Sequence, residues 1–167
     1  LPTKALALSK GFALRFTASA NHDVVRVSPA GIPSGNAPFT LEAWTLYEGG
    51  DGHVLTYGRD DNNSEDVALF ATNGGQICLW RAGHEDICSG VPWPQDGRFH
   101  HVAVTWDQTA IGYFLDGTPV QDRFHPPFNY GEANFLRIGN TLGFRPRQWQ
   151  GVLDEVRISK GVRYSQA

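Results

Sequence analysis

The stretch that decides the fold is Phe99–Gly117, FHHVAVTWDQTAIGYFLDG. In its first arm Val102, Val104 and Trp106 point to one side, while the residues between them point to the other. A polar turn at residues 107–108 follows, the alternation then resumes, and an Asp-Gly pair starts another reversal. This pattern predicts a long antiparallel hairpin with one buried face.

Similar alternating runs occupy most of the remaining chain. Clusters of Gly, Pro, Asn and Asp separate them, and the 19 Gly and 10 Pro are spaced as an all-β domain requires. No segment keeps helical periodicity over three turns. The sequence therefore predicts an all-β fold, a sandwich of two antiparallel sheets. The other predicted strands are 13–16, 24–27, 39–47, 53–57, 67–71, 77–80, 135–138 and 149–158.

Length and composition favour a single domain over residues 1–167. A chain of 167 residues with 41% hydrophobic and 12% aromatic residues can bury a packed core. The net charge of −3 is mixed along the chain, which argues against nucleic acid or an anionic membrane surface as a partner. No apolar run is long enough to span a membrane. Because the chain begins without Met, we expect the mature form, or a piece, of a longer polypeptide.

The two cysteines fall on segments that we expect to pair. Residues 77–80 and 86–89 would form a hairpin around residues 82–85, which places Cys78 and Cys88 on facing arms. A disulfide is the favoured prediction, and two reduced thiols are the alternative. A disulfide would imply an oxidising compartment, hence a secreted or cell-surface protein.

Several short blocks follow one another in a fixed order and cover residues 13–164. They are ALRF at 13–16 with DVVRV at 23–27, FTLEAW at 39–44, FHHVAVTW at 99–106, YFLDG at 113–117, LRIG at 136–139 and GVLDEVRI at 151–158. Together they resemble the laminin-G-like jelly-roll modules of the concanavalin A-like lectin/glucanase superfamily. The resemblance implies a concanavalin A-like jelly roll that binds glycans or protein surfaces, often as part of a larger secreted or surface protein.

The motifs of enzymes with this fold are missing from the sequence. Glycosidases need two carboxylates that face one bond, and related hydrolases carry an E-x-D-x-x-E row that this chain lacks. Related lyases place Arg, Gln, His and Tyr on one sheet face, but the segment Gln76-Ile77-Cys78 has no His. There is no G-x-S-x-G or H-E-x-x-H motif. The sequence therefore predicts that the chain is not an enzyme.

Sugar binding requires aromatic rings that stack on a pyranose and polar groups that bind its hydroxyls. Trp44, Trp106 and Trp149 fall in or beside strands, so we expect them to pack in the core. Trp93 lies in a loop between two prolines, and Trp80 lies at a strand end. These two rings either bind a ligand or cover the edge of the sheet, and the sequence leaves both alternatives open.

The predicted function is a non-catalytic, lectin-like module that binds glycans or glycoconjugates through loops at one rim of the sandwich. The alternatives are an interaction or assembly module of an adhesin, surface or phage-tail protein, able to form homo-oligomers, and, less favoured, a polysaccharide hydrolase or lyase. The predicted ligand-binding residues are Arg59, Asp60, Asp61, Asn62, Asn63, Trp80, His84 and Trp93.

Calcium is the one cofactor for which the sequence offers a candidate ligand. The resemblance implies that Asp154 binds a structural Ca²⁺ ion together with main-chain carbonyls. Alternatively, this short acid faces the core side of the last strand and accepts hydrogen bonds from Arg157 or from loop amides. The acidic loop at residues 60–66 lacks the spacing of an EF-hand, and the six scattered His argue against zinc.

Overall fold

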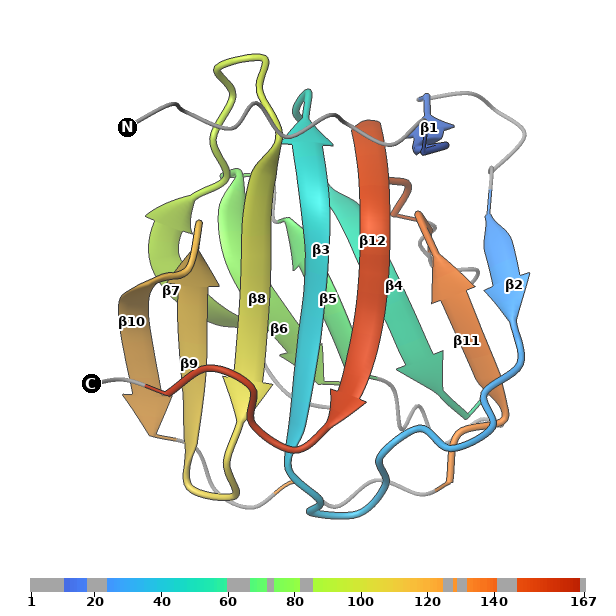
Figure 1. The fold of residues 1–167 in the computed structure, drawn as a ribbon, viewed down its shortest axis with the longest axis vertical. Helices are drawn as coiled ribbons and strands as arrows, with labels where there is room; N and C mark the ends of the chain where they lie inside the picture. The colour runs from blue at the N-terminus through green and yellow to red at the C-terminus, as the bar shows by residue number, and fades with distance from the viewer. Residues whose placement is uncertain are drawn as a thin grey trace, which may run out of the picture.

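The computed structural model describes residues 11–17, 24–59, 67–71, 74–81, 86–124, 128, 132–140 and 147–165. All regular structure in these ranges is β-strand, arranged as two antiparallel sheets of six strands that pack face to face (Figure 1). Accordingly, no helix capable of crossing a membrane occurs in the described part of the chain. The prediction of an all-β sandwich of jelly-roll type is confirmed.

Strands distant in sequence are neighbours in both sheets. Sheet A has the order β1 (Leu14–Phe16), β12 (Gly151–Lys160), β3 (Phe39–Tyr47), β8 (His100–Trp106), β9 (Ala110–Leu115) and β10 (Thr118–Phe124). Sheet B has the order β2 (Val25–Val27), β11 (Phe135–Ile138), β4 (Gly52–Gly58), β5 (Val67–Ala71), β6 (Gln76–Arg81) and β7 (Ile87–Pro92).

The β8–β9 hairpin forms as its sequence predicts. Val102, Val104 and Trp106 are fully buried, and Ile111 and Tyr113 on β9 join them in the core between the sheets. Since side chains alternate along a strand, the residues between these positions face the outside of sheet A. The side chains that the period of two predicts to be buried are therefore the ones that face the core.

Turn chemistry explains where the hairpin reverses. The Asp107 Oδ1 atom accepts hydrogen bonds from the backbone amides of Thr109 and Ala110 at 2.8 and 2.7 Å. At the following reversal Asp116 and Gly117 adopt φ of 50° and 78°, a region that Gly enters freely and Asp tolerates. This second turn places the Asp116 carboxylate at the end of β9, on the outer side of sheet A.

Aromatic side chains hold the two sheets together at one end of the core. The fully buried Trp149 ring lies 5.2 Å from the Tyr47 ring and 5.0 Å from the Trp93 ring. The prediction that Trp106 and Trp149 pack in the core is confirmed. The same prediction for Trp44 is wrong, because 40% of this residue is exposed.

The disulfide joins the edge strand β7 of sheet B to the neighbouring strand β6. Cys78 on β6 and Cys88 on β7 lie opposite each other in the antiparallel register and form a bond. The predicted pairing is therefore confirmed, and Cys78 is fully buried.

A bulge in β12 changes which face its side chains occupy. The register against β3 shifts between Asp154 and Arg157, and Glu155 has φ of 47°. Leu153 lies in the core, so Asp154 faces the opposite side, where it is the cross-strand partner of Trp44. The expectation that Asp154 faces the core side of its strand is wrong.

After β12 the chain turns back across the outer face of sheet A, in front of its central strands (Figure 1). Residues 161–165, which we call the C-terminal segment, contact β3 there. Sequence analysis assigned no role to this segment.

Candidate functional site

The residues predicted to bind a ligand at the rim do not form one described site. Arg59 is exposed directly after β4, whereas Asp60, Asp61, Asn62, Asn63 and His84 lie outside the described residues. Trp80 is only partly exposed. The centroid of its ring lies 5.8 Å from that of the buried His53 ring, in an edge-to-face arrangement. A rim site made by these residues therefore stays a prediction.

For Trp93 the prediction of a ligand-binding role is wrong. Only 1% of the residue is exposed, and its indole Nε1–H donates a hydrogen bond to the Gln76 carbonyl at 3.1 Å. The ring lies in the core between the sheets, where it packs against the rings of Tyr47 and Trp149. The alternative reading, a covering role, is the one the structure supports.

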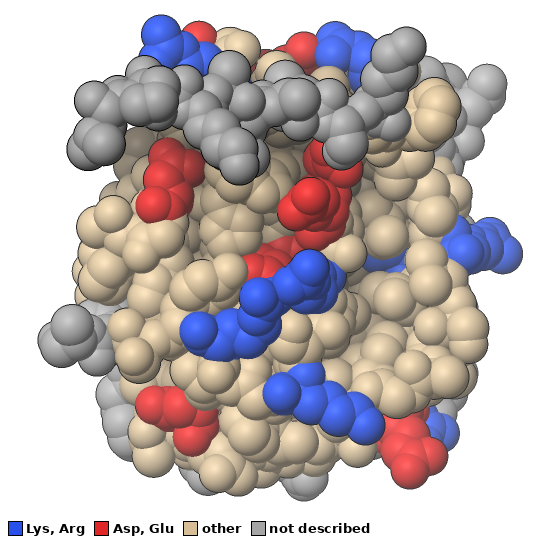
Figure 2. Space-filling view, in the orientation of Figure 1, with Lys and Arg blue, Asp and Glu red and all other residues tan. Residues whose placement is uncertain are grey.

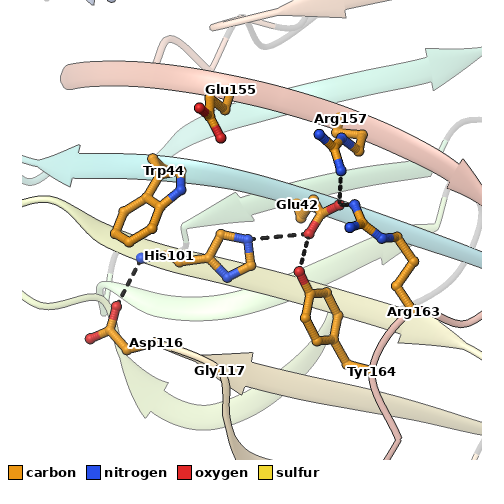
Figure 3. A pocket seen from close by; sticks show the side chains of 9 residues that line it. All are labelled: Glu42, Trp44, His101, Asp116, Gly117, Glu155, Arg157, Arg163 and Tyr164. Atoms are coloured by element: carbon orange, nitrogen blue, oxygen red, sulfur yellow. Dashed lines mark hydrogen bonds and ion pairs between the residues drawn. The ribbon is translucent and has the colours of Figure 1, made fainter. Parts of the chain in front are cut away.

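The structure instead presents a groove of about 400 Å³ on the outer face of sheet A, which we call the outer-face groove (Figure 3). Strands β3, β8 and β12, the β9–β10 turn and the C-terminal segment all contribute to it. Its lining residues are Glu42, Trp44, His101, Asp116, Gly117, Glu155, Arg157, Arg163 and Tyr164.

Trp44 is the aromatic side chain that this groove offers to a ligand. Its neighbours Ala43 and Thr45 are buried, and the alternation along β3 turns Trp44 outward with 40% exposure. The ring of His101 on β8 lies 5.4 Å away at a tilt and supports one side of the indole. An indole supported by a neighbouring ring but still open to solvent is suited to stacking.

Glu42 is the centre of the other end of the groove. Only 3% of the residue is exposed, yet its carboxylate accepts hydrogen bonds from Tyr164 Oη at 2.5 Å, from His101 Nε2 at 3.2 Å and from the Arg163 guanidinium. In addition, Nη1 of Arg157 lies 3.8 Å from Oε1 of the same carboxylate. A buried charge is tolerated only when it is paired in this way.

Two guanidinium groups therefore share one carboxylate at this end. The side chains of Arg157 and Arg163 are 53% and 38% exposed, so both also face solvent. Burial, followed by the neighbouring Glu42 carboxylate, raises the pKa of the Tyr164 hydroxyl. Tyr164 consequently stays protonated and acts as a hydrogen-bond donor to Glu42.

Carboxylates flank the Trp44 end. Burial alone would raise the pKa of Asp116, but hydrogen bonds from His100 Nδ1 at 2.7 Å and from the His101 amide at 2.9 Å lower it. Glu155 stands on the β12 bulge, is exposed, and points toward the groove in Figure 3. Both groups can accept hydrogen bonds from a ligand.

The groove thus combines an open indole face with acceptors at one end and guanidinium donors at the other. Figure 2 shows acidic and basic side chains gathered over the middle of this face of the molecule. Sugars present apolar C–H faces and rings of hydroxyls, which match an aromatic surface bordered by charged acceptors and donors. The arrangement can therefore bind a polyhydroxylated ligand.

The calcium ligand implied by the sequence is placed differently from expectation. Asp154 Oδ1 accepts a hydrogen bond from the Glu155 amide at 2.8 Å, so a local amide satisfies part of this carboxylate. Within the described ranges, no group of three or more His, Cys, Asp and Glu residues is arranged to hold a metal ion. Because main-chain carbonyls can supply most of the six to eight oxygen ligands that Ca²⁺ prefers, calcium binding by Asp154 stays a prediction.

The pattern of β3 contained a signal for the groove that sequence analysis missed. In FTLEAWTLY the side chains of Thr40, Glu42 and Trp44 point to the same side of the strand, and the charged residue indicates that this side faces away from the core between the sheets. Trp44 could thus have been assigned to the face of Glu42. No local pattern links Glu42 to Tyr164, which follows 122 residues later.

Comparison with known proteins bears on the fold and on the family. A family model described as the concanavalin A-like lectin/glucanases superfamily matches residues 19–166. No curated protein sequence matches the chain.

Solved structures with the same fold are distant in sequence. A candidate carbohydrate-binding protein from Bacteroides ovatus ATCC 8483 is 21% identical with a TM-score of 0.66, over 90% of this chain and 44% of that protein. Domain 4 of a GH43 extracellular arabinanase from Geobacillus stearothermophilus, in complex with arabinotriose, is 16% identical with a TM-score of 0.59. The match covers 90% of this chain and 76% of that domain's chain. Domains LG4-5 of the mouse laminin α1 chain are 13% identical with a TM-score of 0.62. The match covers 88% of this chain and 39% of that one.

Proposed function

Because the chain belongs to the concanavalin A-like lectin/glucanases superfamily, we propose that it is a non-catalytic carbohydrate-binding module whose ligand lies in the outer-face groove. A sugar ring stacks on Trp44, and its hydroxyl groups bind Asp116 and Glu155 at one end and Arg157 at the other. The observation that carries this proposal is the exposed indole of Trp44, set among charged donors and acceptors on a rigid sheet.

The state of Glu42 supports binding without catalysis. A glycosidase needs one carboxyl group to transfer a proton and a second to act as base or nucleophile. Glu42, the buried carboxylate of the groove, is occupied by Tyr164, His101 and Arg163. We therefore assign Glu42 a structural role in the groove.

The disulfide supports a secreted or cell-surface location, since such bonds persist in oxidising compartments. The chain spans 44% of the similar Bacteroides protein, so we further propose that it acts as one module of a larger protein. The arabinanase domain solved with arabinotriose supports the choice of neutral oligosaccharides, arabinotriose included, among the probes.

A glycan array followed by calorimetry tests the proposal. We expect a defined oligosaccharide to bind the wild-type domain and Trp44→Ala to weaken its affinity about tenfold or more, because the stacking surface is lost. Phe99→Ala is the matched control, since Phe99 is also an aromatic residue with 42% exposure but does not line the groove. Its Kd should equal that of the wild type.

Two results would overturn the proposal. The first is glycan binding with equal affinity by the wild type and by Trp44→Ala, which would place the site elsewhere. The second is release of reducing ends or unsaturated products when the purified domain is incubated with the polysaccharides it binds, which would make it an enzyme.

A further inference from the structure

The C-terminal segment is attached to β3 through one threonine hydroxyl. The Thr40 Oγ1 atom donates a hydrogen bond to the Gly161 carbonyl at 2.9 Å and accepts one from the Arg163 amide at 3.0 Å. The Gly161 amide also donates to the Pro38 carbonyl at 2.9 Å. Thr40 is fully buried and does not line the outer-face groove.

Two side chains of the segment continue the attachment along the same face of β3. The Tyr164 ring lies 5.7 Å from the His101 ring and 5.4 Å from the Phe114 ring, and its hydroxyl group and the Arg163 guanidinium both bind Glu42. Thr40 and Glu42 are two residues apart on β3, so one strand face holds both the backbone and the side chains of the segment.

The segment nevertheless has the features of a part that opens locally. It forms no strand, Val162 is 41% exposed, and the hydrogen bonds described above all go to one short stretch of the sheet, residues 38–42. Segments with few buried contacts open at a free-energy cost below that of global unfolding.

We propose that the C-terminal segment is a movable wall of the outer-face groove, and that Thr40 is the positioning residue that determines whether Arg163 and Tyr164 can contact the saccharide. This inference rests on the proposed function. When the segment is docked, Arg163 and Tyr164 bind the Glu42 carboxylate, and the ligand meets the Tyr164 hydroxyl and the two guanidinium groups. When it is detached, Glu42 loses the Tyr164 and Arg163 bonds and keeps His101 and Arg157, and the ligand loses two of the lining side chains.

Ligand binding and docking of the segment are consequently coupled. A saccharide that contacts Arg163 and Tyr164 binds the docked state more tightly, so it stabilises docking by the same factor by which docking raises its affinity. The coupling gives Thr40 an effect on affinity although it lies outside the groove.

Thr40→Val tests the coupling because it keeps the side-chain shape and removes both hydrogen bonds. We expect amide exchange at Gly161, monitored by NMR, to accelerate about tenfold, and this amide reports docking because the substitution leaves its acceptor, the Pro38 carbonyl, in place. We expect the Kd of the best array oligosaccharide to rise several-fold. Thr40→Ser keeps the hydroxyl group and should restore both values. Thr105→Val is the matched control, since Thr105 is the cross-strand partner of Thr40 and forms a hydrogen bond with the Gly112 carbonyl rather than with the segment.

The two readouts separate this inference from the proposed function. Faster exchange at Gly161 in Thr40→Val, with an unchanged Kd, would overturn the coupling and leave the glycan site intact. Unchanged exchange in Thr40→Val would overturn the positioning role of Thr40. If no glycan bound at all, the proposed function would fail, and the coupling with it, while the exchange data would still report how the segment docks.

Discussion

At the scale of single residues, His53 shows how burial changes the protonation of a side chain. The residue is 1% exposed, and its Nδ1 atom shares a hydrogen bond of 2.7 Å with Thr56 Oγ1. Burial, followed by the nearby Arg147 charge, lowers its pKa from 6.5 to about 3. Its Nε2 atom is buried and has no hydrogen-bond partner among the residues that the structure describes, so protonation would add a charge without an acceptor there.

His53 should therefore make the protein sensitive to acid. The unfolded chain binds a proton below about pH 6.5 and the folded chain does so only near about pH 3, so stability falls as the pH drops through this window. We expect His53 to account for a loss of about 2 kcal/mol between about pH 7 and about pH 5. Denaturant unfolding of the wild type and of His53→Phe at the two pH values measures this difference.

His100 provides a control of opposite sign. Its hydrogen bond to Asp116 and a second one to Asp96 raise its pKa above 6.5, against the effect of partial burial. Its stabilising contribution is complete below the unfolded-state pKa and is lost as the pH rises through the folded-state pKa. The free energy of unfolding of His100→Gln should differ most from that of the wild type in acid.

For His53, the contradicting outcome is a His53→Phe variant whose stability depends on pH as that of the wild type does.

At the scale of elements, the β6–β7 hairpin illustrates how a covalent bond protects the edge of a sheet. Strand β7 is the last strand of sheet B, and an edge strand is held by hydrogen bonds on one side only. The Cys78–Cys88 bond fixes it to β6, and directly after β7 the Trp93 amide donates to the Gly75 carbonyl. The disulfide thus helps to keep Trp93 in the core.

Replacing both cysteines should destabilise the domain. The bond joins residues separated by 10 positions, and closing a loop of this size contributes about 3 kcal/mol. We expect Cys78→Ser with Cys88→Ser to lower the free energy of unfolding by about this amount, measured by denaturant titration. The wild type under reducing conditions is the control, and equal stability of the double variant and the oxidised wild type would refute the expectation.

At the scale of the whole molecule, one aromatic cluster connects the two sheets. The chain leaves sheet B after β11 and enters sheet A at β12, and Trp149 lies at this crossing, where its amide donates to the Gly139 carbonyl at 2.7 Å. Its ring packs on Tyr47 from sheet A and on Trp93, which follows the last strand of sheet B. Contacts of this kind determine how the sheets face each other.

Trp149→Ala should cost about 3–5 kcal/mol of stability, because it removes a large, fully buried side chain and leaves a cavity between the sheets. Trp44→Ala removes the same atoms from a position with 40% exposure and serves as the comparison. Thermal and denaturant unfolding should show a much larger loss for Trp149→Ala. Similar losses in the two variants would contradict the role of the cluster.

The sequence by itself determined the local architecture. The period of two in residues 99–117 predicts the β8–β9 hairpin and its buried face, and most other strands lie within a residue or two of the runs that predict them. The pairing of Cys78 with Cys88 follows from the same reasoning. These features are set by interactions between residues close in the chain, namely alternation and turn conformation.

Only the tertiary structure decided which side chains are available to a ligand. Trp93 in a proline-flanked loop is buried and Trp44 within a strand is exposed, because exposure depends on what the rest of the chain packs against each ring. The outer-face groove exists because Arg163 and Tyr164 return to Glu42 from more than 120 positions away. No periodic pattern encodes such a contact, since it arises only when both sheets have formed and the chain beyond β12 folds back over them.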